Sequence, residues 1–524
     1  MPGEDADNLI RIGSKKFKTH LKKPNLGQGL GNFGLKKPNF GQGNHLSTSF
    51  PGPILWKNQW TLIPLLKTFP PHLWEMSDPD RFSKTFRFRD AINPVHFDRV
   101  LKYASKIRSI ALGQDLQLEV MELLGLSLPV DEFLPDLLSL RWTPTDDAIF
   151  PYISLFLGQQ LTCLSSSVKS SLPHSSLLSV LASKAPCLTD ISLHWDPLDA
   201  PALVAVSSLI LALPRLQSLS IPQLDPPTYR YLASLPNLKV LSLEHLMSFD
   251  DVAFGSDPFP GLTSLMISSP TIGPAAMAFV GSLSETPLKY FQCTSEALPS
   301  VITIQQLCSG LAAGCSVSHL IEFYMNLGID EDPVNLTLAG IITPDTLTPL
   351  LAFPNLRQVT LDSSLDIALD DAFCAALAAA WPRLEILSLS TFRQGHQQPT
   401  VSLLALSAFA RHCPRLTELT MEFDARELPE PPHPAQERRI SQRALKLLHI
   451  GHSPIESPFL VARFLSIAFP ALEEVNPSLP AGQVPGTVVI EPNYNRWDEV
   501  GKLLPMLVAT RMEDEMYWRA QSRS

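Results

Sequence analysis

The chain has 524 residues, which is too many for one compact hydrophobic core, so we expect several domains or one elongated array. Hydrophobic residues make up 45% of the chain, charged residues 18%, and the formal net charge is −10. The 48 prolines would break helices if they were scattered through them, so we expect them at the boundaries of helices and strands.

Targeting and cysteine patterns indicate an intracellular protein, either cytoplasmic or nuclear. The first residues contain no apolar segment of the kind that a signal peptide needs. No apolar run reaches the roughly 18–20 residues of a membrane-spanning helix, so we expect no membrane partner. The seven cysteines include no C-x-x-C pair and are expected to be reduced thiols.

Residues 1–53 form a segment of different composition. They contain eight Lys or Arg residues against three acids, and all three acids precede Asn8. The sequence LKKPNLGQG at residues 21–29 returns as LKKPNFGQG at residues 35–43. Such low-complexity sequence has too little apolar surface to order itself, so the composition predicts a disordered basic segment.

Residues 54–76 (ILWKNQWTLIPLLKTFPPHLWEM) resemble the closing part of the F-box domain in fungal F-box/leucine-rich-repeat proteins. That family carries a Leu-Trp pair, a Leu-rich turn and a Pro-Pro-x-Leu-Trp exit, which residues 55–56, 62–66 and 70–74 match. The family's opening helix has no counterpart here, because low-complexity sequence occupies its place. The resemblance implies F-box-like helices that bind a ubiquitin-ligase adaptor through Leu55, Trp56, Leu62, Leu65 and Leu66. Alternatively, the segment is a cap that covers the first repeat.

Residues 86–112 are similar to the linker of the same proteins. We therefore expect residues 77–106 to lead from the partial F-box into the first repeat.

A short pattern then recurs along most of the chain. It consists of a leading apolar residue, two variable residues, an apolar residue, one variable residue and another apolar residue, as in PNLKVLSL (residues 236–243), PRLEILSL (residues 382–389) and PRLTELTM (residues 414–421). Successive copies are 22 to 36 residues apart, so the chain is a repeat array. The leading residues are Ile107, Leu137, Leu161, Leu188, Leu216, Leu238, Leu262, Leu288, Leu320, Leu356, Leu384, Leu416, Leu445 and Leu472.

Each copy predicts one strand and one helix. Alternating apolar residues place one face of a strand in the core. Apolar stretches with helical spacing precede many copies, most clearly at residues 203–213, 371–381 and 403–413, and a proline follows each stretch before the next strand. A single helix–strand unit cannot bury its apolar face, whereas stacked neighbours form a continuous core.

This pattern resembles the leucine-rich-repeat family, with CPRLTEL at residues 413–419 similar to its cysteine-containing subclass. The resemblance implies an α/β solenoid over residues 107–480, with a curved parallel sheet, outer helices and a short helical cap at its N-terminal end. Residues 481–524 are expected to form a capping helix and tail, because Trp497, Val500, Leu504 and Leu507 fall at helical spacing.

The variable strand positions should project from the concave face of the sheet. In the eleven repeats from Leu188 onward, three such positions per repeat hold seven carboxylates and no Lys or Arg. Phosphate binding needs the opposite sign, so this surface predicts a protein partner with a basic segment and no nucleic acid. The alternative is that the acids are solvated surface residues. The seven carboxylates are Asp190, Glu244, Glu322, Asp362, Glu418, Glu422 and Glu474.

No pattern predicts an enzyme, a cofactor or a metal site. The G-x-G-x-x-G of residues 29–34 follows no apolar strand and precedes no apolar helix, as a dinucleotide site would require. The run from Gly451 to Pro454 lacks the second glycine of a nucleophile elbow. His412 and Cys413 stand at a predicted helix end, where a buried structural thiol is the simpler interpretation than a nucleophilic pair.

These patterns lead to two hypotheses about function. The first is an F-box-type substrate receptor of a cullin-RING ubiquitin ligase, which the family resemblance implies. The second is a leucine-rich-repeat interaction protein that acts without the adaptor.

Overall fold

The computed structural model describes residues 56–77, 85–194, 200–245, 257–328, 340–391, 398–428, 441–477 and 492–521. Residues 1–52 form a separate unit. The prediction of disorder for residues 1–53 falls on residues outside the described ranges, and Leu55 also lies outside them. All the elements below belong to the unit formed by residues 53–524.

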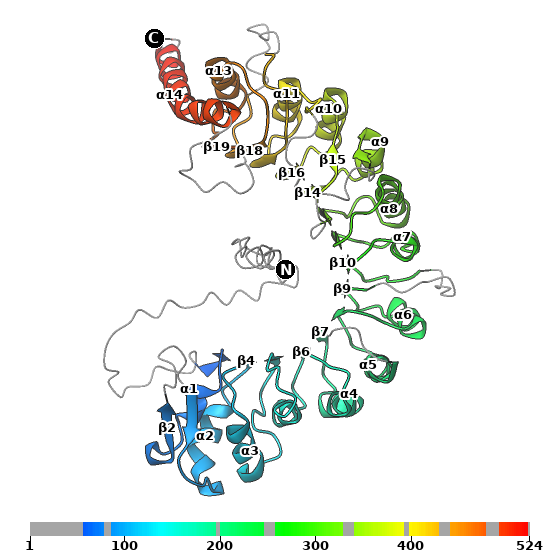
Figure 1. Ribbon diagram of the computed structural model, residues 1–524, viewed down its shortest axis with the longest axis vertical. Helices are drawn as coiled ribbons and strands as arrows, with labels where there is room; N and C mark the ends of the chain where they lie inside the picture. Colours follow the sequence, from blue (N-terminus) through cyan, green and yellow to red (C-terminus); the bar gives the residue numbers. More distant parts are fainter. Residues whose placement is uncertain are drawn as a thin grey trace, which may run out of the picture. The chain divides into compact units, whose positions relative to one another are not determined.

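A single parallel sheet organises this unit, and every described strand pair in it is parallel (Figure 1). Its 15 strands follow the order of the chain: β1 (Asn58–Gln59), β4 (Ser109–Leu112), β5 (Ser139–Trp142), β6 (Cys163–Ser167), β7 (Asp190–His194), β8 (Ser218–Ile221), β9 (Val240–Leu243), β10 (Ser264–Ser269), β11 (Tyr290–Ser295), β12 (Glu322–Leu327), β14 (Gln358–Ser363), β16 (Ile386–Thr391), β17 (Glu418–Thr420), β18 (Leu447–Gly451) and β19 (Glu474–Pro477).

Helices connect most of these strands and lie on the outer side of the arc that the strands form (Figure 1). They are α3 (Leu118–Ser127), α4 (Leu172–Lys184), α5 (Ala200–Leu211), α6 (Pro226–Ala233), α7 (Pro274–Gly281), α8 (Val301–Gly314), α9 (Pro344–Leu347), α10 (Asp371–Ala380), α11 (Leu403–His412), α13 (Pro458–Ala468) and α14 (Pro492–Gln521). Two 3-10 helices, η4 (Phe150–Phe156) and η6 (Thr348–Ala352), complete the outer layer.

The repeat pattern produces this architecture residue by residue. All fourteen leading residues are at most 6% exposed, and the alternate apolar strand residues are buried as well. The buried side chains form one continuous cluster between the sheet and the helices. The predicted helices agree with α5, α10 and α11, and the prolines follow their ends. The chain is therefore a leucine-rich-repeat solenoid with a curved parallel sheet and outer helices.

Helix starts are also encoded locally. Asp225, Ser300 and Asp370 lie just before α6, α8 and α10, and each side chain accepts a hydrogen bond from a backbone N–H in the first turn. Such caps satisfy donors that have no partner inside the helix. Several other helices begin with proline at the first or second position, where its missing N–H costs nothing.

The N-terminal part differs from the expected helices and linker. Residues 56–77 contain only a four-residue helix, α1 (Ile63–Leu66), and a 3-10 helix, η2 (Pro71–Leu73). They also supply β1, which extends the sheet by one strand before the first predicted repeat. The expected linker contains the helix α2 (Phe97–Ala104), and an antiparallel hairpin joins β2 (Trp74–Ser77) to β3 (Thr85–Phe88). Pairing β1 with β4 satisfies backbone groups that the first repeat would otherwise leave open.

At the other end, α14 extends on both sides of the residues from Trp497 to Leu507, whose spacing predicted a helix. It packs against α13 and β19. Trp497, Val500 and Leu504 are at most 1% exposed, and Leu507 packs against the same cluster. The Trp497 indole Nε1 donates a hydrogen bond of 2.7 Å to the carbonyl oxygen of Ser453. The helix therefore covers the apolar side of the last repeat.

Candidate functional site

The candidate site is the open face of the sheet, which we call the concave face. Strand residues alternate between buried positions, which point toward the helices, and half-buried positions, which point away from them. The register is continuous from strand to strand, so equivalent half-buried residues form rows across the sheet. The three variable positions of the repeat are the positions of these rows.

Four predicted carboxylates lie in the row that contains the first residue of each strand. This row runs from Asp190 on β7 through Glu322 on β12 and Glu418 on β17 to Glu474 on β19. Neighbouring strands are about 4.8 Å apart, so Glu322 and Glu418, which are three strands apart, are separated by about 14 Å. Glu474 is exposed and the other three are half-buried.

The remaining three predicted carboxylates lie where the strands end. Asp362 is on β14, in register with Asn326 and Ser390. Glu244 follows β9 directly, and Glu422 lies just beyond the short strand β17. The structure therefore places all seven predicted acids along the concave face or at its rim.

Several of these carboxylates already have partners within the chain. Oxygen Oδ1 of Asp362 accepts hydrogen bonds from the hydroxyls of Ser388 (3.3 Å) and Ser390 (2.5 Å). Burial raises the pKa of Asp362, although the two hydrogen bonds act in the opposite direction. Glu244 and Glu418 lie beside histidines, with Oε1 of Glu244 3.5 Å from His194 and Oε1 of Glu418 3.7 Å from His449.

Glu422 has a structural role as well. One of its carboxylate oxygens accepts a hydrogen bond of 2.9 Å from the backbone N–H of His452. Its side chain packs on Gly451, whose φ of 54° is left-handed, and a Cβ atom at that glycine would lie 2.3 Å from Oε1 of Glu422. The carboxylate therefore fixes the end of β18, where the register with β19 shifts.

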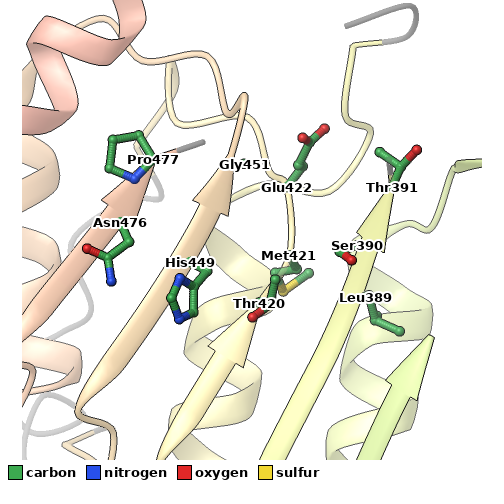
Figure 2. Close-up of a pocket in the computed structure, with 10 residues that line it drawn as sticks. All are labelled: Leu389, Ser390, Thr391, Thr420, Met421, Glu422, His449, Gly451, Asn476 and Pro477. Carbon is green, nitrogen blue, oxygen red and sulfur yellow. The ribbon is translucent and has the colours of Figure 1, made fainter. Parts of the chain in front are cut away.

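A hollow of about 110 Å³ opens at this shift (Figure 2). Its walls come from β16, the end of β17, β18 and β19. Figure 2 shows His449 and Thr420 on adjacent strands, with Glu422 at the upper wall near Gly451. Because β17 is only three residues long, the concave face is recessed here. The hollow is the size of one side chain, and its lining offers a carboxylate and an imidazole as polar contacts.

An aromatic cluster, which the sequence-based prediction did not single out, lies at the middle of the concave face. Tyr290 on β11 and Tyr324 on β12 have ring centroids 5.2 Å apart with an interplanar angle of 37°. The Tyr324 hydroxyl donates to Glu322 (3.0 Å), and the Tyr290 hydroxyl donates to Gln292 (2.6 Å). Burial raises the pKa of Tyr290 to about 12 and the pKa of Tyr324 still further. Two tyrosines in rows otherwise rich in Ser and Thr were a visible signal in the sequence.

The acidic character of the concave face has a boundary. Toward the N-terminal end, Arg141 on β5 lies in the same row as Ser165 and Ser192. It is exposed, so a basic group stands on the concave face ahead of the acidic repeats. The surface without Lys or Arg in its rows therefore begins at β6, and its carboxylates begin with Asp190 on β7.

The residues predicted to bind a ubiquitin-ligase adaptor lie in the core. Trp56 is 9% exposed, Leu62 and Leu65 at most 1%, and Leu66 2%. Trp56 stacks on Tyr103 of α2, and all four side chains belong to the continuous apolar cluster. These four side chains therefore pack beneath the first strands of the array.

Cys413 and Ser453, the candidate nucleophiles of the sequence, are both buried. Cys413 is buried, its Sγ lies 3.5 Å from the Ala378 carbonyl oxygen, and burial raises the pKa of its thiol to about 12. Ser453 is buried and donates a hydrogen bond to the Ile450 carbonyl oxygen. Among the described residues, no group of three or more His, Cys, Asp or Glu could hold a metal ion. The glycine motif of residues 29–34 lies outside the described residues.

No described helix is both long enough and apolar enough to pass through a membrane.

No family model matches the chain, and no curated protein matches it. One similar solved structure is the complex of Rad7 and Elc1 in yeast, with 18% identity over 66% of this chain and 84% of that chain and a TM-score of 0.35. Another is the TLR13–ssRNA13 complex, with 15% identity over 77% of this chain and 60% of that chain and a TM-score of 0.32. The repeat fold rests on the strands, register and burial described above.

Proposed function

We propose that this chain is a protein-binding leucine-rich-repeat scaffold whose concave face, from β7 to β19, takes a partner segment that carries basic residues. The observation that carries the proposal is the charge of that face. Its rows contain seven carboxylates and no Lys or Arg, on a sheet whose other face packs against the helices. A surface lined by negative charges attracts a positively charged ligand over a distance and raises the association rate of that ligand.

The spacing of the acids limits the shape of the partner. Glu322 and Glu418 are about 14 Å apart along their row, and an extended chain rises about 3.4 Å per residue. A partner segment that crosses the strands therefore meets both carboxylates if its basic residues are about four positions apart. A polyanion such as nucleic acid would be repelled by the same row.

Charge reversal on the concave face tests this proposal. In the variant Glu322→Lys, Asp362→Lys and Glu418→Lys, the association rate of an oligolysine peptide should fall about tenfold or more at low salt, because attraction becomes repulsion. The measurement is stopped-flow fluorescence with a labelled peptide at several salt concentrations. The matched control reverses three exposed helix residues, Glu122, Glu499 and Glu513, and so changes the net charge equally. Equal loss in both variants would mean that only net charge matters and would refute a concave binding site.

The ubiquitin-ligase receptor role rests on the resemblance of residues 54–76 alone. The burial of Trp56, Leu62, Leu65 and Leu66 favours the alternative, a scaffold that acts without the adaptor. We therefore expect the full chain not to co-purify with the ubiquitin-ligase adaptor when both are produced together. A stable complex that survives size-exclusion chromatography would establish the receptor role instead. An F-box protein known to bind the adaptor serves as the positive control.

A further inference from the structure

The middle of the concave face differs from the rest of its rows in having aromatic groups beside an acid. Tyr290 and Glu322 are register partners on β11 and β12, and Gln292 and Tyr324 are partners two residues further along the same two strands, in the next row. The four side chains thus form a compact block on two adjacent strands. All four are half-buried, so each keeps part of its surface open to a ligand.

Glu322 is a half-buried carboxylate that keeps most of its capacity to accept hydrogen bonds. It accepts one hydrogen bond, from Tyr324 to Oε2, and forms no ion pair with any described residue. By contrast, Glu418 and Glu244 lie beside histidines, and Asp362 accepts from two serines. Lys289 immediately precedes Tyr290 and is exposed, and it forms no ion pair with Glu322. No basic side chain of the block itself competes for Glu322.

Two phenol rings beside a carboxylate form an environment for a cation. Ring faces attract cations electrostatically, and the attraction grows when the contact is partly desolvated. The phenols are neutral at neutral pH and burial raises their pKa values further, so the block offers ring faces and one carboxylate. A guanidinium can stack on a ring and donate hydrogen bonds to a carboxylate at the same time, which an ammonium ion cannot do equally well. A cage for methylated lysine would need more aromatic walls than these two rings supply.

We infer that Tyr290, Glu322 and Tyr324 form the anchor site of the concave face and that this site takes an arginine side chain of the partner protein. The inference rests on the proposed function, because it names the one group by which the basic segment is held. It also places the strongest contact in the middle of the array, with the outer carboxylates contributing attraction over a distance. Tyrosine and arginine are typical of the few residues that dominate interface energies.

Short lysine-rich peptides that differ only in their central residue test the inference. The three peptides carry arginine, lysine or citrulline at the centre, and fluorescence anisotropy measures their affinity for the full chain. We expect the arginine peptide to bind about threefold to fivefold more tightly than the lysine peptide, with the citrulline peptide weakest. The preference for arginine should disappear in Tyr324→Leu and in Glu322→Gln, and should persist in Tyr324→Phe, which keeps the ring.

Glu474→Gln is the matched control. It removes a carboxylate from the same row, where Leu447 is the neighbour and no aromatic ring lies beside it in register. This variant should weaken all lysine-rich peptides slightly and leave the preference for arginine intact. Melting temperatures of the variants identify any loss of folding, and the half-buried Glu322→Gln is expected to fold if Tyr324→Leu does not.

The outcomes separate the two proposals. If arginine and lysine peptides bind the unmodified chain equally, or if the preference survives both Tyr324→Leu and Glu322→Gln, the anchor site is refuted. The concave binding surface still stands in that case, provided that charge reversal at Glu322, Asp362 and Glu418 weakens binding. If no peptide binds at all, both proposals fail.

Discussion

Leu241 illustrates how one side chain holds neighbouring repeats together. It is fully buried on β9, in register with Leu219 on β8 and Leu265 on β10. Leu241→Asp would place an unpaired carboxylate in this shared core, so we expect the free energy of unfolding to fall by more than about 4 kcal/mol. Urea unfolding followed by circular dichroism measures the change.

The adjacent position is the control for Leu241. Ser242 points to the concave face and is half-buried, so Ser242→Asp should change the free energy of unfolding by about 1 kcal/mol or less. Similar losses in the two variants would contradict the assignment of these residues to opposite faces of the sheet.

His174 predicts a pH dependence of stability. It is 3% exposed on α4 and stacks on Phe150, and its Nδ1 accepts a hydrogen bond from the backbone N–H of Lys169. Burial lowers the pKa of His174 from 6.5, and the neighbouring Asp147 only partly offsets this effect. The folded chain therefore binds fewer protons than the unfolded chain just below pH 6.5. Stability from this group is complete above that pH and is lost as the pH falls toward the lowered value.

The test compares the unmodified chain with His174→Phe, which cannot titrate. The urea midpoint of the unmodified chain should fall more steeply between about pH 7 and pH 5 than that of the variant. Parallel curves would show that His174 does not contribute.

Gln442 is a buried polar residue that the repeat pattern does not predict. In most other repeats the position three residues before the leading residue is apolar, as at Leu235, Trp381 and Phe469. Gln442 is buried there, and its Nε2 donates to the carbonyl oxygens of Cys413 (3.2 Å) and Leu416 (2.7 Å). Its Oε1 accepts from the backbone N–H groups of Ala444 and Leu445. A buried amide with every partner satisfied replaces apolar packing between two repeats.

At the scale of elements, α14 closes the array by packing against α13 and β19. Trp497 packs edge-to-face on Phe423 and donates its indole N–H to Ser453. Trp497→Ala should cost about 3–5 kcal/mol of local stability and should expose amides of α14, β18 and β19 to hydrogen exchange.

Met512 provides the control on the same helix. It is 58% exposed, so Met512→Ala should leave the exchange pattern unchanged. If Trp497→Ala also leaves it unchanged, α14 does not hold the last repeat in place.

The elements also show which parts of the fold the sequence predicts. The leading residues and the helix-ending prolines are local patterns, and they determine each repeat independently of the others. By contrast, β1 has two residues and no recognisable pattern, and it forms because β4 offers it a backbone edge. The full length of α14 is likewise not encoded in a local pattern, because apolar spacing predicts only the part of the helix that packs against the core.

At the scale of the whole molecule, the register gathers the seven acids on one face of the sheet. Glu322 and Glu418 lie about 14 Å apart along their row. In about 0.1 M salt, interactions between exposed charges are largely screened beyond about 10 Å. Each exposed ion pair is worth about 1 kcal/mol or less, so single carboxylates should matter little and the effect of the triple reversal should fade as salt is added. The sequence predicted these acids because strand alternation determines their face. It did not predict the tyrosine block or the hollow beside Glu422, which depend on which strands are neighbours and where they end.

The two ends of the sheet have a consequence for self-association. A head-to-tail contact between copies that does not close on itself grows into a filament, and an open sheet edge is a template for such growth. Here β1 offers only two residues, and β19 ends at Pro477, which has no N–H to donate. The helix α14 also packs against β19. Both edge strands are therefore poor templates for pairing, and we expect copies of the chain not to extend the sheet by joining end to end.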